Sequence, residues 1–195
     1  MHVHHTPGPT RRAAMVAGAR VCYTMTMLSL NLIVRAVIFH EGKFLVTVLD
    51  DGERAAFSAF LGGHVRLGET LQNCARREVS EEVGLDVTVA KLLYVVENFF
   101  YRGASKLHEI GYYFLCLPAK PVSGALIEKL TPNLDEMISP ELLTPQELGE
   151  ANFQPALLKQ TLCEDARENF ASCPRAVIVN ELPGDVDAVN GVYQL

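Results

Sequence analysis

The stretch GHVRLGETLQNCARREVSEEVGL, residues 63–85, carries most of the information on fold in this chain of 195 residues. It predicts a helix that begins after Thr70, whose hydroxyl can accept from the first free backbone N–H groups. Gly84 is typical of the left-handed residue that ends a helix. Apolar residues recur at every fourth position and form a narrow stripe suited to packing on a sheet. These residues are Leu71, Ala75, Val79 and Val83.

Three glutamates crowd the last turns of the predicted helix. At about 100° per residue, Glu78 and Glu82 lie almost in line, and Glu81 lies within about a quarter turn of them. Like charges at this spacing repel, and acids at the C-terminal end of a helix oppose its dipole. The cluster therefore predicts a divalent-cation site. The alternative is a solvated acidic face without a role, which the added spacing of Gly63 and Arg77 disfavours.

The order and spacing of these residues resemble the box of the Nudix hydrolase family, which includes the MutT-like enzymes. The family pattern is Gly, five residues, Glu, seven residues, Arg-Glu, an aliphatic residue, any residue, Glu-Glu, any residue, Gly and an aliphatic residue. The matching residues are Gly63, Glu69, Arg77, Glu78, Val79, Glu81, Glu82, Gly84 and Leu85.

The resemblance implies an α/β fold, namely an α/β/α sandwich with a mixed sheet, over residues 30–163. We expect residues 1–29 to form an N-terminal extension that is poorly ordered. Residues 164–195 are then a C-terminal extension, in which RAVIVNEL, residues 175–182, is expected to add an edge strand.

The activity implied by the resemblance is hydrolysis of a pyrophosphate bond in a nucleoside diphosphate linked to another group, by attack of water on phosphorus. The implied cofactor is Mg²⁺ or Mn²⁺, and hard cations of this kind take oxygen ligands. The implied metal ligands are Glu78, Glu81, Glu82 and the carbonyl of Gly63. Glu81 is either a ligand or the group that orients the water, and Arg77 and Glu69 position the acids.

Two residues near the box depart from the common family pattern. Leu61 stands where a proline often precedes the two glycines, and Arg66 stands where an acid is common. Neither is a fixed position of the box, so we expect activity to be retained. Arg66 is a candidate contact for a substrate phosphate, and the alternative is an exposed loop arginine without a role.

Residues outside the box supply further candidates for the site. An additional carboxylate from a later strand or loop is expected, and Glu109 and Glu136 are favoured over Glu97 and Asp135. A glutamate within an apolar strand is notable because burying it without a partner is costly. Aromatic residues could stack on a base or belong to the core. They are Phe99, Phe100, Tyr101 and Tyr112.

Alternation and turn residues predict the remaining elements. Two strands, residues 32–40 and 43–50, should form a hairpin around the turn EGK. A loop is expected over residues 51–58, and Ala59 to Leu61 should lead from it into the box loop. The later elements follow in order. They are a strand or pair of strands over 87–100, a turn over 101–106, a strand over 108–117, a loop over 118–134 and two short helices within 144–166, with Pro145 at a helix start.

Composition limits the partners and the compartment. The net charge of −6 and the absence of a basic run argue against a nucleic-acid-binding surface. Five cysteines without a CxxC pair suggest free thiols in a reducing compartment, and hence the cytoplasm. No apolar run reaches the length of about 18 residues that a membrane-spanning helix needs. The expected partner is a nucleotide-type small molecule, with a homodimer left open.

The sequence leaves the substrate open. Phe99 and Phe100 stand where ADP-ribose hydrolases of the family often have a proline, and Tyr101 lies near a tyrosine that is common in dinucleoside-polyphosphate hydrolases. A second function class is a catalytically silent, nucleotide-sensing Nudix module that acts as a regulator. The complete acid cluster favours the enzyme.

Overall fold

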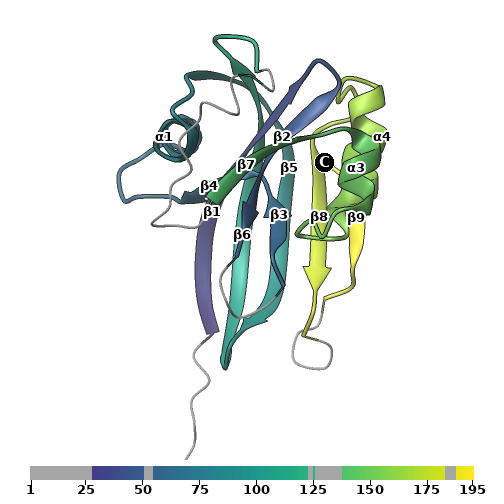
Figure 1. Cartoon of the computed structure of the whole chain (residues 1–195). Helices are drawn as coiled ribbons and strands as arrows, with labels where there is room; N and C mark the ends of the chain where they lie inside the picture. Colours follow the sequence, from purple (N-terminus) through teal and green to yellow (C-terminus); the bar gives the residue numbers. More distant parts are fainter. Residues whose placement is uncertain (1–27, 51–54, 123–124, 126–137, 183–187) are drawn as a thin grey trace, which may run out of the picture.

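The computed structural model describes residues 28–50, 55–122, 125, 138–182 and 188–195 (Figure 1). Within these residues, nine strands form one mixed sheet with the order β3-β2-β1-β6-β5-β8-β9, in which β4 pairs with β1 and β7 with β2. The strands are β1 (Leu28–His40), β2 (Lys43–Leu49), β3 (Phe57–Ala59), β4 (Leu61–His64), β5 (Val87–Arg102), β6 (Ser105–Pro118), β7 (Ile138–Leu143), β8 (Arg175–Asn180) and β9 (Gly191–Gln194). The helices are α1 (Leu71–Val83), α3 (Pro145–Glu150) and α4 (Leu158–Arg167).

Two helical layers cover opposite faces of the sheet (Figure 1). On one face, Val34 and Ala36 of β1 pack with Ala75 and Val79 of α1. On the other face, Val37 of β1 packs with the apolar residues of α3 and α4, which are Leu148, Leu158 and Leu162. Successive side chains of β1 therefore serve different layers, as the two-residue period of a strand requires. The predicted α/β sandwich with a mixed sheet is confirmed.

The first hairpin is confirmed. β1 and β2 pair antiparallel, and Phe39 lies opposite Phe44. Glu41 and Gly42 at the turn have φ angles of 50° and 76°. Two successive positive φ angles are characteristic of the tight turns that match the twist of the flanking strands.

The predicted loop over residues 51–58 extends too far. Phe57 and Ser58 belong to β3, and Phe57 lies opposite Leu49 of β2. A strand of three residues is too short to show alternation, so its sequence does not distinguish it from a loop. β4 follows at once, which places Gly62 and Gly63 within a strand, where a loop was expected. Residues 51–54 lie outside the described residues.

The predicted strands over 87–100 and 108–117 are present as the long hairpin of β5 and β6. The pairing of β5 is irregular between Val89 and Lys91 and between Leu92 and Tyr94. The turn is shorter than residues 101–106, because pairing continues to Arg102 and resumes at once on β6. The two predicted helices are present, with Pro145 in the first turn of α3. The predicted loop over 118–134 lies largely outside the described residues.

The C-terminal segment completes the same sheet. β8 pairs parallel with β5 and antiparallel with β9, so β8 is an inner strand and β9 occupies the edge. The boundary expected at residue 163 falls inside α4. Asp165 of this helix accepts hydrogen bonds from Tyr94 of β5 and Arg175 of β8, each at 2.8 Å. In the described part of the chain, no helix is long and apolar enough to cross a membrane.

Candidate active site

Helix α1 begins and ends where its sequence predicts. The hydroxyl of Thr70 accepts from the backbone N–H of Asn73 at 3.2 Å. At the other end, Gly84 has a φ of 65° and its N–H donates to the carbonyl of Ser80 at 3.0 Å. The predicted stripe faces the sheet, with Ala75, Val79 and Val83 buried and Leu71 packed partly against the same cluster. This packing orients the acidic face of the helix toward β4.

Two glycines bring the backbone of β4 unusually close to its neighbours. Gly62 has a φ of 144°, and a Cβ there would lie 2.0 Å from the carbonyl oxygen of Val34. A Cβ on Gly63 would lie 2.8 Å from the carboxylate of Glu78. Glycine has no Cβ, so the strand can approach both groups. The glycines thus make room for the acids of α1 beside β4.

The three box glutamates differ in burial and in partners. Glu82 is 9 % exposed, and its Oε2 accepts from the N–H of Gly62 at 3.1 Å. Glu78 has 14 % of its side chain exposed and lies against Gly63. Glu81 is the outermost, with 49 % of its side chain exposed. The exposure of the acids therefore increases from Glu82, beside the sheet, through Glu78 to Glu81, at the solvent.

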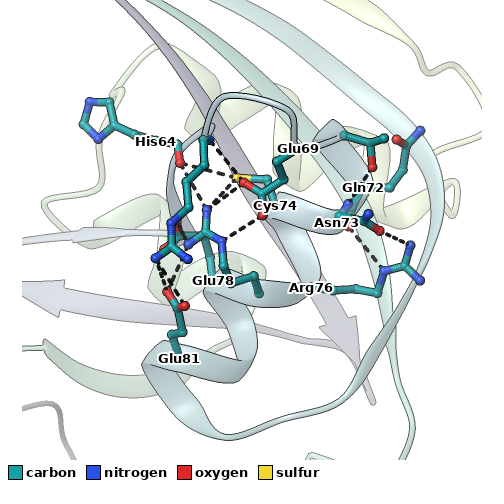
Figure 2. A network of polar contacts seen from close by, with 11 residues as sticks. His64, Glu69, Gln72, Asn73, Cys74, Arg76, Glu78 and Glu81 are labelled. Carbon is teal, nitrogen blue, oxygen red and sulfur yellow. Dashed lines mark hydrogen bonds and ion pairs between the residues drawn. The ribbon is translucent and has the colours of Figure 1, made fainter.

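Arg77 links the acids to the loop before the helix, and the contacts of Glu69, Glu78 and Glu81 can be followed in Figure 2. Its Nε and Nη2 donate to the two carboxylate oxygens of Glu69 at 2.8 and 2.9 Å. Its Nη1 donates to Glu78 at 2.5 Å and to Glu81 at 2.9 Å. Its Nη2 also donates to the carbonyl of His64 at 3.2 Å. Planar guanidinium groups suit such forked contacts.

These contacts shift the pKa values of Glu69 and Arg77. The pKa of Glu69 falls from 4.5 to about 2, chiefly because Arg77 donates hydrogen bonds to its carboxylate. A further contribution comes from the backbone N–H of Arg66, which donates to Glu69 at 3.2 Å. The pKa of Arg77 is raised by the same hydrogen bond to Glu69. Both groups are therefore charged at neutral pH.

One cavity collects most of the predicted site residues. It has a volume of about 530 Å³ and lies between β1, β4, α1 and the end of the β5–β6 hairpin. The predicted residues on its wall are Gly63, Arg66, Arg77, Glu78, Glu81, Glu82 and Glu109. Glu69 does not line this cavity, but it accepts a hydrogen bond from Arg77, which does. Arg66 is 62 % exposed at its side chain and lies 3.3 Å from Glu81.

A smaller cavity of about 110 Å³ adjoins the first. The two share four residues, which are Arg35, Leu49, Arg102 and Glu109. The smaller cavity is also lined by the aromatic side chains of Phe57, Phe100 and Tyr113 and by the amide of Asn98. Among the residues that the structure describes, none makes a hydrogen bond to the buried Oδ1 of Asn98. The combined space therefore has a charged part and an aromatic part.

Other predicted residues lie away from these cavities. Phe99 is 8 % exposed and stacks on His108 at 4.3 Å between ring centroids, and His108 Nε2 lies 2.8 Å from Glu97. Tyr101 is 49 % exposed and lines neither cavity. Alternation along β5 explains the result, because Phe100 faces the smaller cavity and its neighbours face the other side of the sheet. Asp135 and Glu136 lie outside the described residues.

The structure adds arginines that the sequence analysis missed. Arg35 and Arg102 line both cavities. Arg35 interrupts the apolar run LIVRAVIF, and this charge within a buried strand was the available signal. Arg102 carried no such signal, because it lies in the segment that was expected to be a turn.

The donor chemistry of the box fits a divalent cation. Three carboxylates and a backbone carbonyl are hard oxygen donors of the kind that Mg²⁺ and Mn²⁺ prefer. A Cβ on Gly63 would collide with the carboxylate of Glu78, so the backbone at this position lies within reach of the acids. As the side chains lie, no group of three or more His, Cys, Asp or Glu converges on one point in the described residues. Arg77 holds Glu78 and Glu81, and Gly62 holds Glu82.

Comparisons with solved structures agree with the fold. A NUDIX hydrolase from Nitrosomonas europaea is 19 % identical with a TM-score of 0.58, and the match covers 82 % of this chain and 84 % of that one. A MutT protein from Bacillus halodurans is 11 % identical with a TM-score of 0.58, covering 83 % and 97 %. An ADP-ribose pyrophosphatase from Streptococcus suis is 19 % identical with a TM-score of 0.51, covering 77 % and 98 %.

At these identities the structural matches show a common fold. The family is shown independently by the model of the NUDIX domain, which matches residues 30–161. Hydrolases of this family generally use divalent metals and split pyrophosphate bonds. The chain therefore belongs to the Nudix family.

Proposed function

We propose that this enzyme hydrolyses the pyrophosphate bond of a nucleoside diphosphate linked to another group, with Mg²⁺ or Mn²⁺ as its cofactor. One observation carries the proposal. Glu78, Glu81, Glu82 and Gly63 line the same cavity, although Gly63 belongs to β4 and the acids to α1. The packing of α1 on the sheet puts these residues on the wall of one cavity, which supports a site for such a cation.

The residues of the box have distinct roles in this proposal. Glu78 and Glu82 would hold the cation together with the carbonyl of Gly63, and Glu81 would be a further ligand or would orient the attacking water. Arg77 and Glu69 position the acids through the contacts described above. When bound, the cation neutralises charge that develops on the phosphoryl oxygens and lowers the pKa of its bound water.

The two cavities support a substrate with a charged part and an aromatic part. The chain has a net charge of −6, which would repel a pyrophosphate. Arg66 and Arg102 on the wall of the larger cavity counter this repulsion locally. Phe100 and Tyr113 in the smaller cavity offer apolar ring surface for a base. Glu109 lies where the cavities meet and is our candidate for the additional carboxylate.

We assign the enzyme to the cytoplasm. The described cysteines, Cys74, Cys116, Cys163 and Cys173, are all free. Free thiols in this number are typical of a reducing compartment.

A substrate screen tests the proposal. Purified full-length enzyme is incubated with nucleotide sugars, dinucleoside polyphosphates, ADP-ribose and oxidised deoxynucleoside triphosphates in the presence of Mg²⁺. Phosphate release is measured directly and after addition of a phosphatase, which detects monophosphate products. We expect turnover of at least one compound, its loss with EDTA and its return with excess Mg²⁺. Absence of turnover across the whole screen, or turnover that EDTA does not affect, would contradict the proposal.

A further inference from the structure

Arg35 makes a forked contact that the box pattern does not include. It projects from β1, and its Nη1 donates to the carbonyl oxygens of Phe60 at 3.1 Å and Gly62 at 3.0 Å. Its neighbours Val34 and Ala36 are fully buried. A charge in such a strand is costly unless its donors are satisfied, and here two backbone carbonyls of the adjacent segment accept from it.

One of the two residues that Arg35 contacts, Gly62, also binds an acid of the box. Gly62 accepts from Arg35 through its carbonyl and donates through its N–H to Glu82 at 3.1 Å. The next residue, Gly63, is the one whose missing Cβ leaves room for the carboxylate of Glu78. One glycine pair therefore lies between the arginine of β1 and two acids of α1.

Backbone pairing with β1 runs along the whole of this segment, and the N–H of Gly62 also donates to Glu82. β4 has four residues and, among the described strands, pairs only with β1, where Gly62 lies opposite Arg35. Gly62 has a φ of 144° and, as a glycine, no side chain whose contacts could fix its backbone. Arg35 binds the carbonyls of Phe60 and Gly62, on either side of Leu61, and so adds a side-chain restraint where β4 begins.

We propose that Arg35 is a positioning residue of the metal site, acting on Glu82 and Glu78 through the backbone of Gly62 and Gly63. The inference rests on the proposed function, since it assumes that these acids bind a divalent cation. Groups that orient metal ligands through hydrogen bonds change both the metal affinity and the activity when they are lost. Arg35 would act in this way without touching the metal or the reacting atoms.

A glutamine substitution tests the role. In full-length Arg35→Gln, the Kd for Mn²⁺ without substrate is measured by electron paramagnetic resonance, followed by kcat and KM for a substrate from the screen. We expect the Kd to rise and kcat to fall by about 10- to 100-fold, with KM within about twofold of the wild type. Arg35→Lys should recover part of the loss, because an ammonium donates hydrogen bonds but lacks the planar fork.

Two arginines provide matched controls. Arg76→Gln removes an α1 arginine that donates to Gln72 and Asn73 and lines neither cavity, so metal affinity and activity should not change. Arg102→Gln removes a charge from the same two cavities as Arg35, and it should leave the Mn²⁺ Kd unchanged. A Kd raised equally by Arg102→Gln would show a general charge effect and overturn the positioning role.

The remaining outcomes are also decisive. Unchanged Kd and kcat in a folded Arg35→Gln would overturn the inference. A raised KM with unchanged Kd would make Arg35 a contact for the substrate anion, which also overturns it. If Arg35→Gln does not fold, Arg35→Lys decides, with a raised Kd supporting the role and a wild-type Kd rejecting it. A wild-type enzyme that binds no Mn²⁺ would overturn the proposed function itself, and the inference with it.

Discussion

The guanidinium of Arg77 holds both carboxylate oxygens of Glu69, at 2.8 and 2.9 Å, with 16 % and 14 % of the two side chains exposed. The pair joins the loop that follows β4 to the middle of α1. Because the same guanidinium also contacts Glu78 and Glu81, the position of the acid cluster depends on it. The Nudix box thus contains an ion pair that holds its acids in place, and the contribution of this pair to stability can be tested by varying the pH.

Acid should weaken the ion pair between Glu69 and Arg77. The pKa of Glu69 is lowered from 4.5 to about 2, so the folded state holds the carboxylate in its charged form. This contribution is fully present above about pH 4.5 and is lost as the pH falls toward 2. Glu69→Gln should therefore be less stable than the wild type at pH 7, with a gap that narrows at pH 3. Urea denaturation at both pH values measures it.

The control for this experiment is Glu141→Gln, which removes an exposed carboxylate from β7. It separates the loss of a charge from the loss of the pair with Arg77. A gap between the wild type and Glu69→Gln that is constant from pH 7 to pH 3 would exclude the ion pair as its origin.

Loss of the charge of Glu82 should abolish most turnover. Glu82→Gln retains an oxygen that can accept from Gly62, so the fold should remain, but the side chain no longer offers a charged ligand. We expect kcat to fall by at least about 100-fold, as for loss of a ligand to a phosphoryl-transfer metal. Steady-state kinetics with Mg²⁺, together with a thermal melt, check this. Rates near those of the wild type would remove Glu82 from the site.

A methyl group at Gly63 should displace Glu78. The added Cβ would lie 2.8 Å from the carboxylate carbon and both oxygens, which is closer than packing permits. Displacement of a catalytic group by about 1 Å can cost about 100-fold in rate, so Gly63→Ala should lower kcat on that scale. The matched control is Gly149→Ala in α3, where a Cβ would meet no described atom within 4 Å apart from its chain neighbours and the backbone of its own helix. Equal kinetics for the two variants would refute the close approach of β4 and Glu78.

The buried carboxylate of Asp165 should be essential to the C-terminal part of the sheet. It is 1 % exposed and accepts from Tyr94 and Arg175, which lie on β5 and β8. Removing one partner of a buried pair costs about 3 kcal/mol or more, and Asp165→Ala should lose stability on this scale. Glu164→Ala, next to it on the exposed side of α4, is the control. Chemical denaturation compares the two, and similar values would show that the network contributes little.

Local patterns predicted the helix and its acids well. The cap at Thr70, the end at Gly84 and the buried stripe of α1 depend on residues within a few positions of one another, and all three were recovered. The hairpin around Gly42 was recovered for the same reason. The short strand β3 was missed, because three residues are too few to show the alternation of apolar and polar residues that marks a strand.

The sequence by itself determined the family, the bounds of α1 and the face that carries Glu78 and Glu82, because spacing, caps and helical period are properties of a continuous segment. Only the tertiary structure decided which face of β5 meets the cavities, and hence that Phe100 lines the smaller one and Phe99 does not. It also decided that Arg35, far from the box in sequence, contacts the backbone of Gly62. Strand pairing and register bring such residues together, and these depend on contacts between distant segments.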